Sequence, residues 1–439
     1  AVVEEKTATC TVTVTLPADS ISLSEKKLLL LAGNEETLTY SIRPENSTSK
    51  VVWSVEPEGI ASVNDGTVTA LAQGEAVVRA TVDGHSSSCW VRVTEDGFNY
   101  QLSEDGQSYS VEQNYHSMVD LTEAEIASEY NGKPVTTIGR WALSGLDDTL
   151  QKLKIPASVT AIDLNSIDYC RMLESIEVDE NNPEYATVGG ILYNKAVTES
   201  IYTPRGITGV VTIPESMTKI SDYMFNNCAK ITGVKMHDGV TAIGKGAFGN
   251  CTGLHSITIP QNVTEIGERA FSGCTKLWEI YNLSGLKIEL GGDAWTATHG
   301  QIGLYALNIL YSKNDPSGIH KTDDGFTFYT ARDEVYLVDY TGDETELVLP
   351  QNYNDSAYKI HNYTFYDCDF LTSVTIPNGV TSIGYYAFFG CRGLTNIKFE
   401  GTKEEWKAIE KDSYWNSSTD DFTIQCTDGK LDKNGKEIA

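Results

Sequence analysis

The sequence lacks any long apolar run. A membrane-spanning helix needs about 20 consecutive apolar residues, and the longest candidate here, Leu28–Ala32, has only the length of a strand. The first residues, AVVEEKTATC, also lack the charged, apolar and small-residue zones of a secretory signal. We therefore expect no membrane insertion within this chain, and we expect any export signal or wall anchor to have been removed or to lie outside it.

Basic residues are scarce. Lysine and arginine number 33 against 61 aspartates and glutamates, which gives a formal net charge of −28. Such a charge repels phosphate backbones, and no lysine or arginine cluster offsets it, so nucleic acid is not expected as a partner. The acidic surface serves solubility or attracts cations and basic partners.

Catalytic and metal-binding signatures are also missing. The seven histidines include no pair three or four residues apart and no H-E-x-x-H, so there is no zinc signature. No G-x-S-x-G elbow and no phosphate-binding glycine loop occurs. The Asp-rich segment 428–435 lacks the regular acidic series and the closing glutamate of a calcium loop. We predict no catalytic residue, no metal and no cofactor; the chain is not expected to be an enzyme.

The cysteines that are present repeat at a fixed spacing. Cys228, Cys251 and Cys274 are separated by 23 residues each, and Cys368 and Cys391 by the same number. A disulfide framework rarely has one period, whereas a repeat does. We predict that these cysteines are buried as small apolar rungs of a ladder; metal binding or disulfide formation is the alternative, although parallel side chains have poor geometry for a disulfide.

The repeat itself reads V-T-x-I-G-x-x-A-F-x-x-C-x-x-L-x-x-I-x-I-P. The I-x-I-P part predicts a short strand ended by proline, V-T-x-I-G a second extended piece, and A-F-x-x-C-x-x-L one face of a short helix. A unit of 23 residues cannot bury its own core, so neighbouring units must stack into a solenoid. Units begin at Val135, Val159, Ile213, Val240, Val263, Tyr358 and Val380.

A different repetition marks the N-terminal part. Residues 8–15 (ATCTVTVT) match residues 87–94 (SSCWVRVT), and Cys10 and Cys89 take the same place 79 residues apart. That distance is one small β-sandwich. Residues 1–13 are therefore predicted to be the last strand of a preceding module, and residues 14–95 a complete sandwich of short alternating strands with Trp53 as a core anchor.

Both parts resemble known families. The stretch VVWSVEPEGIASVNDGTVTALAQGEAVVRATV resembles the group 2 bacterial immunoglobulin-like domains of adhesins and other surface proteins. The V-T-x-I-G…A-F-x-x-C units resemble the BspA-like leucine-rich repeats of bacterial surface antigens and adhesins, as do three hairpin segments (from Asp96, Gly189 and Asp324) and an ending that looks like a terminal cap. The resemblance implies a mostly β protein: an N-terminal immunoglobulin-like β-sandwich followed by a right-handed α/β leucine-rich-repeat solenoid over residues 96–439.

One long segment departs from the repeat. Between Cys274 and Cys368 lies an irregular stretch that contains Trp295, Tyr305 and Tyr311. Insertions in repeat proteins map to loops, often on a binding side, while a degenerate repeat that still packs in the core is the other interpretation. His299 belongs to the same stretch.

Ligand contacts are expected on the outer face of the strands. Residues that alternate with the inward isoleucines line up when coils stack; they are polar for the most part, as solvated strand positions are. Tyr281 beside Trp278 is the best candidate because aromatic residues concentrate binding energy. The candidate contacts are Trp278, Tyr281, Lys235, Lys154 and Lys398. The outward pairs are Lys152 and Lys154, Ser175 and Glu177, Gly233 and Lys235, Ser256 and Thr258, Glu279 and Tyr281, Ser373 and Thr375, and Asn396 and Lys398.

Taken together, the sequence predicts a non-catalytic, extracellular or surface-anchored binding protein. The immunoglobulin-like part would act as a stalk and the solenoid as a head that adheres to a host or bacterial surface protein or to a glycan. We expect a monomer. Two alternatives stay open: a carbohydrate-binding accessory module, which an exposed row of aromatic side chains would favour, and a purely structural surface spacer.

Overall fold

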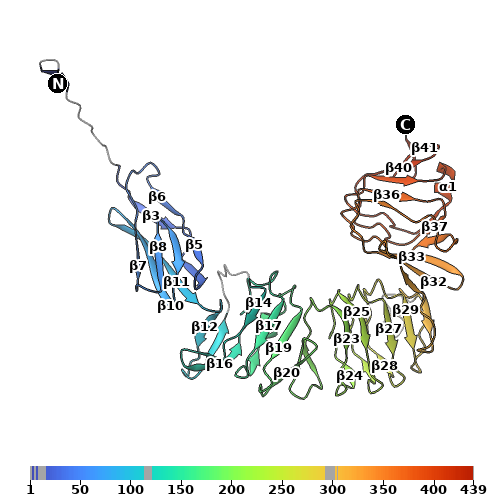
Figure 1. The fold of residues 1–439 in the computed structure, drawn as a ribbon, viewed down its shortest axis with the longest axis horizontal. Helices are drawn as coiled ribbons and strands as arrows, with labels where there is room; N and C mark the ends of the chain where they lie inside the picture. The colour runs from blue at the N-terminus through green and yellow to red at the C-terminus, as the bar shows by residue number, and fades with distance from the viewer. Residues whose placement is uncertain are drawn as a thin grey trace. The chain divides into compact units, whose positions relative to one another are not determined.

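The computed structural model is almost entirely β (Figure 1). It describes residues 16–112, 121–291, 302–303 and 305–438, and the backbone of two short paired strands, β1 (Val2–Val3) and β2 (Lys6–Thr7). The predicted strand of a preceding module, residues 1–13, otherwise lies outside the described residues, as does Cys10. The chain forms two compact units, Ala1–Ile207 and Thr208–Ala439.

The first unit begins with a β-sandwich whose strands alternate between a buried and an exposed face. Val78, Cys89 and Val91 are fully buried in its core, and Trp53 packs against that core while staying half-buried. The predicted role of Trp53 as an anchor is thus met at the edge of the core. The sheets are β4 (Lys27–Leu31), β11 (His85–Thr94), β10 (Gly74–Val82) and β7 (Val52–Glu56); β3 (Ser20–Leu23) and β6 (Tyr40–Arg43); and β5 (Glu35–Thr37), β9 (Thr67–Ala70) and β8 (Ala61–Asn64).

The same unit continues into stacked coils. Two of the predicted hairpins are present, one from β12 (Asn99–Leu102) and β13 (Tyr109–Glu112), the other from β20 (Tyr185–Val188) and β21 (Ile191–Asn194). The parallel ladders of this unit are β14 (Glu123–Glu125), β17 (Lys152–Ile155) and β19 (Ser175–Val178), and β13, β16 (Lys133–Ile138) and β18 (Ala161–Ile162); β15 (Glu129–Tyr130) pairs with β16, β22 (Ser200–Tyr202) with β21, and η1 (Leu164–Ser166) is a single 3₁₀ turn.

The second unit repeats the arrangement with longer ladders. The I-x-I-P strands form one set of parallel sheets and the V-T-x-I strands another, as predicted. The first set is β23 (Gly209–Thr212) and β25 (Ile231–Lys235); β27 (Ser256–Ile259), β29 (Glu279–Asn282) and β30 (Asn308–Leu310); and β34 (Glu346–Val348), β36 (Ser373–Ile376), β38 (Asn396–Phe399), β40 (Thr423–Cys426), β41 (Gly429–Asp432) and β42 (Glu437–Ile438). The second set is β24 (Lys219–Ile220), β26 (Ala242–Ile243) and β28 (Glu265–Ile266); and β31 (Ile319–Lys321), β32 (Phe326–Ala331), β33 (Glu334–Tyr340), β35 (Tyr358–Ile360), β37 (Val380–Ile383) and β39 (Glu410–Lys411).

Aromatic rings stack between successive coils in the core. The ring centroids of Phe225 and Phe248 lie 5.3 Å apart with an interplanar angle of 5°, and those of Phe248 and Phe271 lie 5.0 Å apart at 18°. Phe365 and Phe388 repeat this contact at 4.8 Å. All five rings are buried. The predicted ladder is confirmed: each coil covers the apolar side of the next.

The cysteines occupy buried rungs beside these rings. The Cys251 thiol donates to the carbonyl of Phe225 across 3.0 Å, and the Cys391 thiol donates to the carbonyl of Phe365 across the same distance. Burial raises the pKa of Cys391 to about 12. The apolar, buried rung predicted for the spacing of 23 residues is what these positions hold; Cys368 is half-buried.

The segment A-F-x-x-C does not form the predicted helix. It is a pair of tight turns, and the only α-helix among the described residues is α1 (Lys403–Ala408). Two residues per coil, such as Tyr386 (φ 55°) and Gly390 (φ 74°), adopt the left-handed region and interrupt any helix. Backbone donors point to the next coil instead: the N–H of Phe365 donates to the carbonyl of Ala387 at 2.8 Å.

The glycine of V-T-x-I-G is explained by close backbone approach. A Cβ at Gly267 would lie 2.5 Å from the backbone nitrogen of Lys245 in the preceding coil. No side chain fits at such a distance, so the repeat keeps glycine here and the coils can stack closely.

The irregular segment after Cys274 partly rejoins the repeat. Strand β30 pairs in parallel with β29, as a further coil would. This pairing favours the degenerate-repeat interpretation for residues 308–310. Tyr305 is half-buried and Tyr311 is exposed, whereas Trp295 and His299 lie outside the described residues.

Candidate binding surface

The predicted lysine contacts lie on outward strand positions. Lys235 on β25 and Lys398 on β38 are exposed, and Lys154 on β17, in the other compact unit, is half-buried. Lys154 pairs with Glu125 on the adjacent strand at 3.2 Å, so its charge is partly balanced. The alternation predicted for these strands is correct, but nothing gathers the lysines of the second unit into one site.

Trp278 does not belong to the surface. The ring is fully buried, stacks on His255 at 4.7 Å between centroids, and packs with Tyr329 and Val338 of the β32–β33 hairpin. Its prediction as a ligand contact fails in this conformation because the hairpin from the irregular segment covers it. The sequence marked the hairpin but not the face against which it folds.

Glu279, predicted to point outward, is buried by the same hairpin. Its carboxylate accepts hydrogen bonds from the N–H of Gly318 and the hydroxyl of Ser317, both at 3.0 Å, and from the Tyr329 hydroxyl at 3.2 Å. Its neighbour Tyr281 is half-buried. Burial, reinforced by the negative charge of Glu279, raises the pKa of Tyr281 to about 12. Tyr281 therefore keeps only part of its ring available to a partner.

A larger aromatic surface lies elsewhere, on the turn segments of three successive coils. Tyr366 and Phe389 stack at 5.1 Å with an interplanar angle of 7°, Tyr386 lies 4.6 Å from Phe389, and Tyr414 lies 6.0 Å from Tyr386. The Tyr363 ring lies 5.6 Å from that of Tyr386. We call this set the tyrosine cluster; its members are Tyr363, Tyr366, Tyr385, Tyr386, Phe389 and Tyr414.

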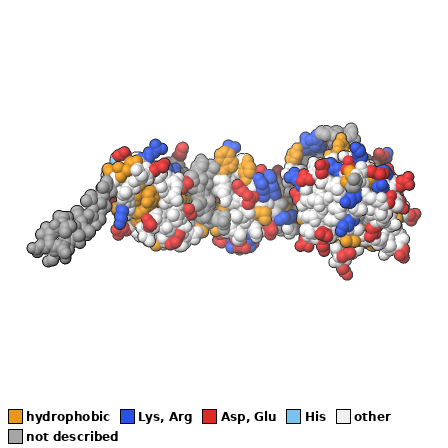
Figure 2. Space-filling view, turned by 90° about the horizontal axis from the view of Figure 1, so that it is seen from above, with side chains coloured by type: hydrophobic (Ala, Val, Ile, Leu, Met, Phe, Trp, Pro, Cys, Tyr) orange, Lys and Arg blue, Asp and Glu red, His pale blue; other side chains and the backbone are white. Residues whose placement is uncertain are grey.

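The cluster is open to solvent. Tyr414 is 61% exposed and Tyr366 is 42% exposed, while the rings between them are half-buried against one another. Asp367, Asp369 and Asp412 are exposed close to these tyrosines in the sequence. Figure 2 shows Asp and Glu side chains spread over the visible face with Lys and Arg between them. A contiguous group of exposed rings with acidic neighbours is unusual on a protein that contacts nothing.

Each coil holds one cluster residue at the same strained backbone position. Tyr363, Tyr386 and Tyr414 have φ of 62°, 55° and 60°. A left-handed conformation costs an L-residue about 1–2 kcal/mol, and bulky residues at such positions concentrate at functional sites. Glycine can take the place, since Gly246 does so in an earlier coil. The equivalent residues of the other coils are Trp141 (φ 59°), Tyr223 (φ 59°), Gly246 (φ 57°) and Arg269 (φ 56°).

Sequence reasoning missed this surface. The motifs HNYTFYD, GYYAFFG and DSYWNS were assigned to a helix whose apolar face is buried. The signal that could have found the cluster is the recurrence of an aromatic residue two places before the core phenylalanine, at Tyr363 and Tyr386, in addition to the core residue itself. The left-handed backbone that turns this residue outward is not visible in the apolar pattern.

No helix in the described part of the chain is long and apolar enough to cross a membrane.

Family models match most of the chain. The bacterial immunoglobulin-like domain (group 2) matches residues 17–93. The BspA-type leucine-rich-repeat region matches in six copies over residues 108–210, 207–289 and 353–435.

Among curated proteins, an uncharacterized protein of Clostridium acetobutylicum is 40% identical over 92 residues, which is 20% of this chain and 10% of that protein. The chain therefore spans only a small part of that relative. Among solved structures, a leucine-rich-repeat protein from Eubacterium ventriosum is 24% identical with a TM-score of 0.32, covering 68% of this chain and 65% of the other.

Two further structures have similar statistics. A leucine-rich cell surface protein from Faecalibacterium prausnitzii is 17% identical with a TM-score of 0.30 and covers 73% of this chain and 97% of its own. The pneumococcal vaccine antigen PcpA is 16% identical with a TM-score of 0.33, covering 76% and 73%. With its repeat model matched over more than half of its length, and an immunoglobulin-like domain before the repeats, the chain belongs to the BspA-type leucine-rich-repeat proteins.

Proposed function

We propose that this chain is a non-catalytic adhesion protein, secreted or held at the cell surface, that binds a host or bacterial surface ligand through its solenoid. The observation that carries the proposal is the tyrosine cluster. Proteins of this family are typically cell-surface or secreted, which supports the localisation. The immunoglobulin-like part would serve as the stalk, and the protein would act as a monomer.

The cluster has the properties of an energetic centre for binding. Tyrosine carries a large apolar ring and a polar hydroxyl, and tyrosines are enriched among the residues that dominate interfaces. The cluster rings also hold one another in place: Tyr366 stacks on Phe389, and Tyr386 contacts both. Preordered rings lose little conformational entropy when a partner docks.

A glycan is the second candidate ligand, and one observation favours it. The rings form a row along successive coils, which is the arrangement expected of a surface that stacks on consecutive sugars. Asp367, Asp369 and Asp412 would supply acceptors for sugar hydroxyls. A spacer function is less compatible with exposed aromatic side chains held in a strained backbone.

The test is binding of the whole chain to panels of matrix proteins, bacterial surface proteins and glycans. We expect signal on one panel, and its loss when Tyr386 and Tyr414 are both replaced by glycine. The matched control is Tyr223→Gly, since Tyr223 has the same backbone conformation and is 53% exposed but lies outside the cluster. Silence on every panel, or equal loss in the control, would refute adhesion through this surface.

A further inference from the structure

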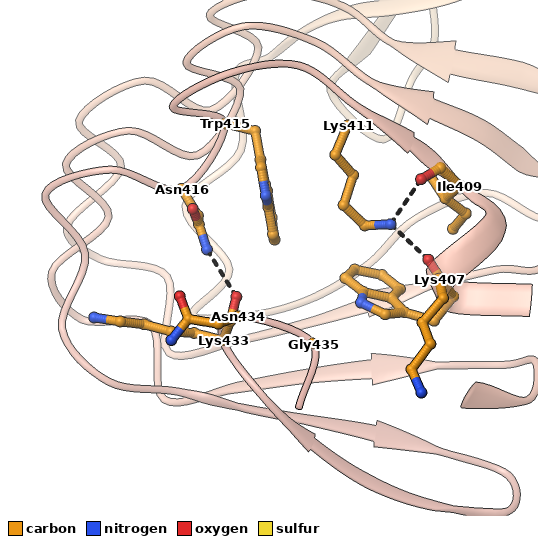
Figure 3. Close-up of a pocket in the computed structure, with 9 residues that line it drawn as sticks. Lys407, Ile409, Lys411, Trp415, Asn416, Lys433, Asn434 and Gly435 are labelled. Carbon is orange, nitrogen blue, oxygen red and sulfur yellow. Dashed lines mark hydrogen bonds between the residues drawn. The ribbon is translucent and has the colours of Figure 1, made fainter. Parts of the chain in front are cut away.

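The C-terminal coil and its cap enclose a cavity distinct from the tyrosine cluster. It has a volume of about 470 Å³, within the range of roughly 300–1,000 Å³ that is common for small-ligand sites. Helix α1 with the β39 strand that follows forms one side, and the turn before β42 forms the other (Figure 3). Its walls include Trp406, Trp415, Lys407, Lys411, Lys433 and Asn416.

The charge inside this cavity is opposite to that of the protein. The net charge of the chain is −28, yet the charged residues that line the cavity are Lys407, Lys411 and Lys433, with no carboxylate among the described lining residues. Lys407 reaches Glu437 at 3.4 Å and Lys433 reaches Asp421 at 2.8 Å, but both acidic partners are exposed. Exposed pairs of this kind contribute little and exchange readily with a competing anion.

Lys411 is the most confined of the three lysines. Its ammonium donates to the carbonyls of Trp406 at 2.5 Å and Ile409 at 2.8 Å, and it lies 4.6 Å from the centroid of the Trp406 ring (Figure 3). An ammonium has three donors, so one N–H is left for a ligand. Burial lowers the pKa of Lys411 to about 8, as expected for an ammonium that no carboxylate of the described residues neutralises. An anion beside it would relieve that cost.

The remaining walls suit a sugar ring more than a bare anion. Trp406 and Trp415 meet edge to face with centroids 6.1 Å apart, and their side chains enclose the cavity with little exposure of their own. The Asn416 amide donates to the carbonyl of Lys433 at 3.2 Å, which orients its oxygen as an acceptor. An indole face packs on the apolar face of a pyranose, while an amide oxygen accepts from its hydroxyls.

We propose that this cavity binds a carboxylated sugar, with its carboxylate on Lys411 between the two flanking lysines and its ring against Trp415. The site is independent of the tyrosine cluster, and its ligand need not be the adhesion ligand. Lys411 is a binding residue in this scheme, and Lys407 and Lys433 add attraction from the rim.

The direct test is calorimetric titration of the whole chain with glucuronate, glucose and sulfate at matched ionic strength. Glucuronate is expected to bind, whereas glucose lacks the charge and sulfate lacks the ring. No binding of glucuronate, or equal binding of either comparison compound, overturns the proposal. A disaccharide that ends in glucuronate then separates the sources: tighter binding than the monosaccharide assigns the site to the end of a polysaccharide, and weaker binding to the free acid, and either order supports the shared chemistry.

Variants locate the site. Lys411→Gln should weaken glucuronate binding about tenfold or more, because a hydrogen bond to a charged group is lost. Since Lys411 is half-buried, Lys433→Gln on the rim provides a second variant that keeps the fold, with an expected loss of about fivefold from one charge near 4 Å in water. Lys430→Gln on β41, outside the cavity, is the control. Unchanged affinity in a folded Lys433→Gln, or equal loss in the control, overturns the assignment.

Discussion

Replacing Tyr386 by glycine separates binding from folding in a way that the backbone makes possible. Tyr386 adopts φ 55°, a conformation that glycine takes without strain, and Gly246 already holds the equivalent place in another coil. The substitution therefore removes an exposed aromatic ring without forcing the turn to change. Few surface aromatic residues offer so clean a deletion.

The expected stability change is small because opposing effects nearly balance. Relief of left-handed strain favours the variant by about 1–2 kcal/mol, whereas the greater freedom of glycine in the unfolded chain costs about 0.5–1 kcal/mol. Loss of the ring pairs with Phe389 (4.6 Å) and Tyr363 (5.6 Å) costs about 0.5–1.5 kcal/mol each. The net change is about 0–2 kcal/mol of destabilisation, against roughly 3–5 kcal/mol for truncation of a buried ring such as Phe388.

The binding change is expected to be much larger. A central aromatic contact contributes about 2 kcal/mol or more to an interface, so affinity for the surface ligand should fall about thirtyfold. Urea denaturation measures the stability and surface plasmon resonance the affinity. An unchanged affinity in a folded Tyr386→Gly variant would refute the role of the cluster, and a loss of stability comparable to that of Phe388→Ala would refute the account of the backbone.

Three further predictions concern the solenoid. Phe248→Ala should lower the free energy of unfolding by about 3–5 kcal/mol, because the ring stacks on both neighbouring coils; a loss below 1 kcal/mol in urea denaturation would contradict the ladder. Burial lowers the pKa of His255 and of His361 to about 4, and unfolded histidine titrates near 6.5, so stability present above that pH should be lost as the pH falls towards 4. Thermal melts over this range should show a smaller loss when both are replaced by phenylalanine; an identical pH dependence would exclude them as the cause. Burial also raises the pKa of the Cys251 and Cys391 thiols, so the folded chain should react slowly with thiol reagents while the denatured chain, kept from oxygen, titrates nearly all of its cysteines; several disulfides by mass spectrometry would disprove the buried rungs.

The regular part of the fold could be read from the sequence because its cause is local. The spacing of Cys228, Cys251 and Cys274 sets the coil length, and alternating isoleucines set the inward face of each strand. Both signals arise from residues that repeat the same environment in every coil, so the solenoid, its ladders and two hairpins followed directly.

Long-range contacts could not be read in the same way. Trp278 was assigned to the surface because its strand pattern is regular, but a hairpin about 50 residues later covers it. The turn conformation was also hidden: an apolar residue every third or fourth place fits a helix and fits two left-handed turns equally well. That ambiguity concealed the outward direction of Tyr363, Tyr386 and Tyr414, and with it the tyrosine cluster.

Hydroxyl-radical footprinting of the chain with and without its bound surface ligand tests adhesion through the cluster most directly. Tyr366, Tyr386 and Tyr414 should become protected in the complex, while the exposed Tyr223 and Tyr311 keep their reactivity. Unchanged oxidation of the three cluster rings, together with protection elsewhere on the solenoid, would contradict the account.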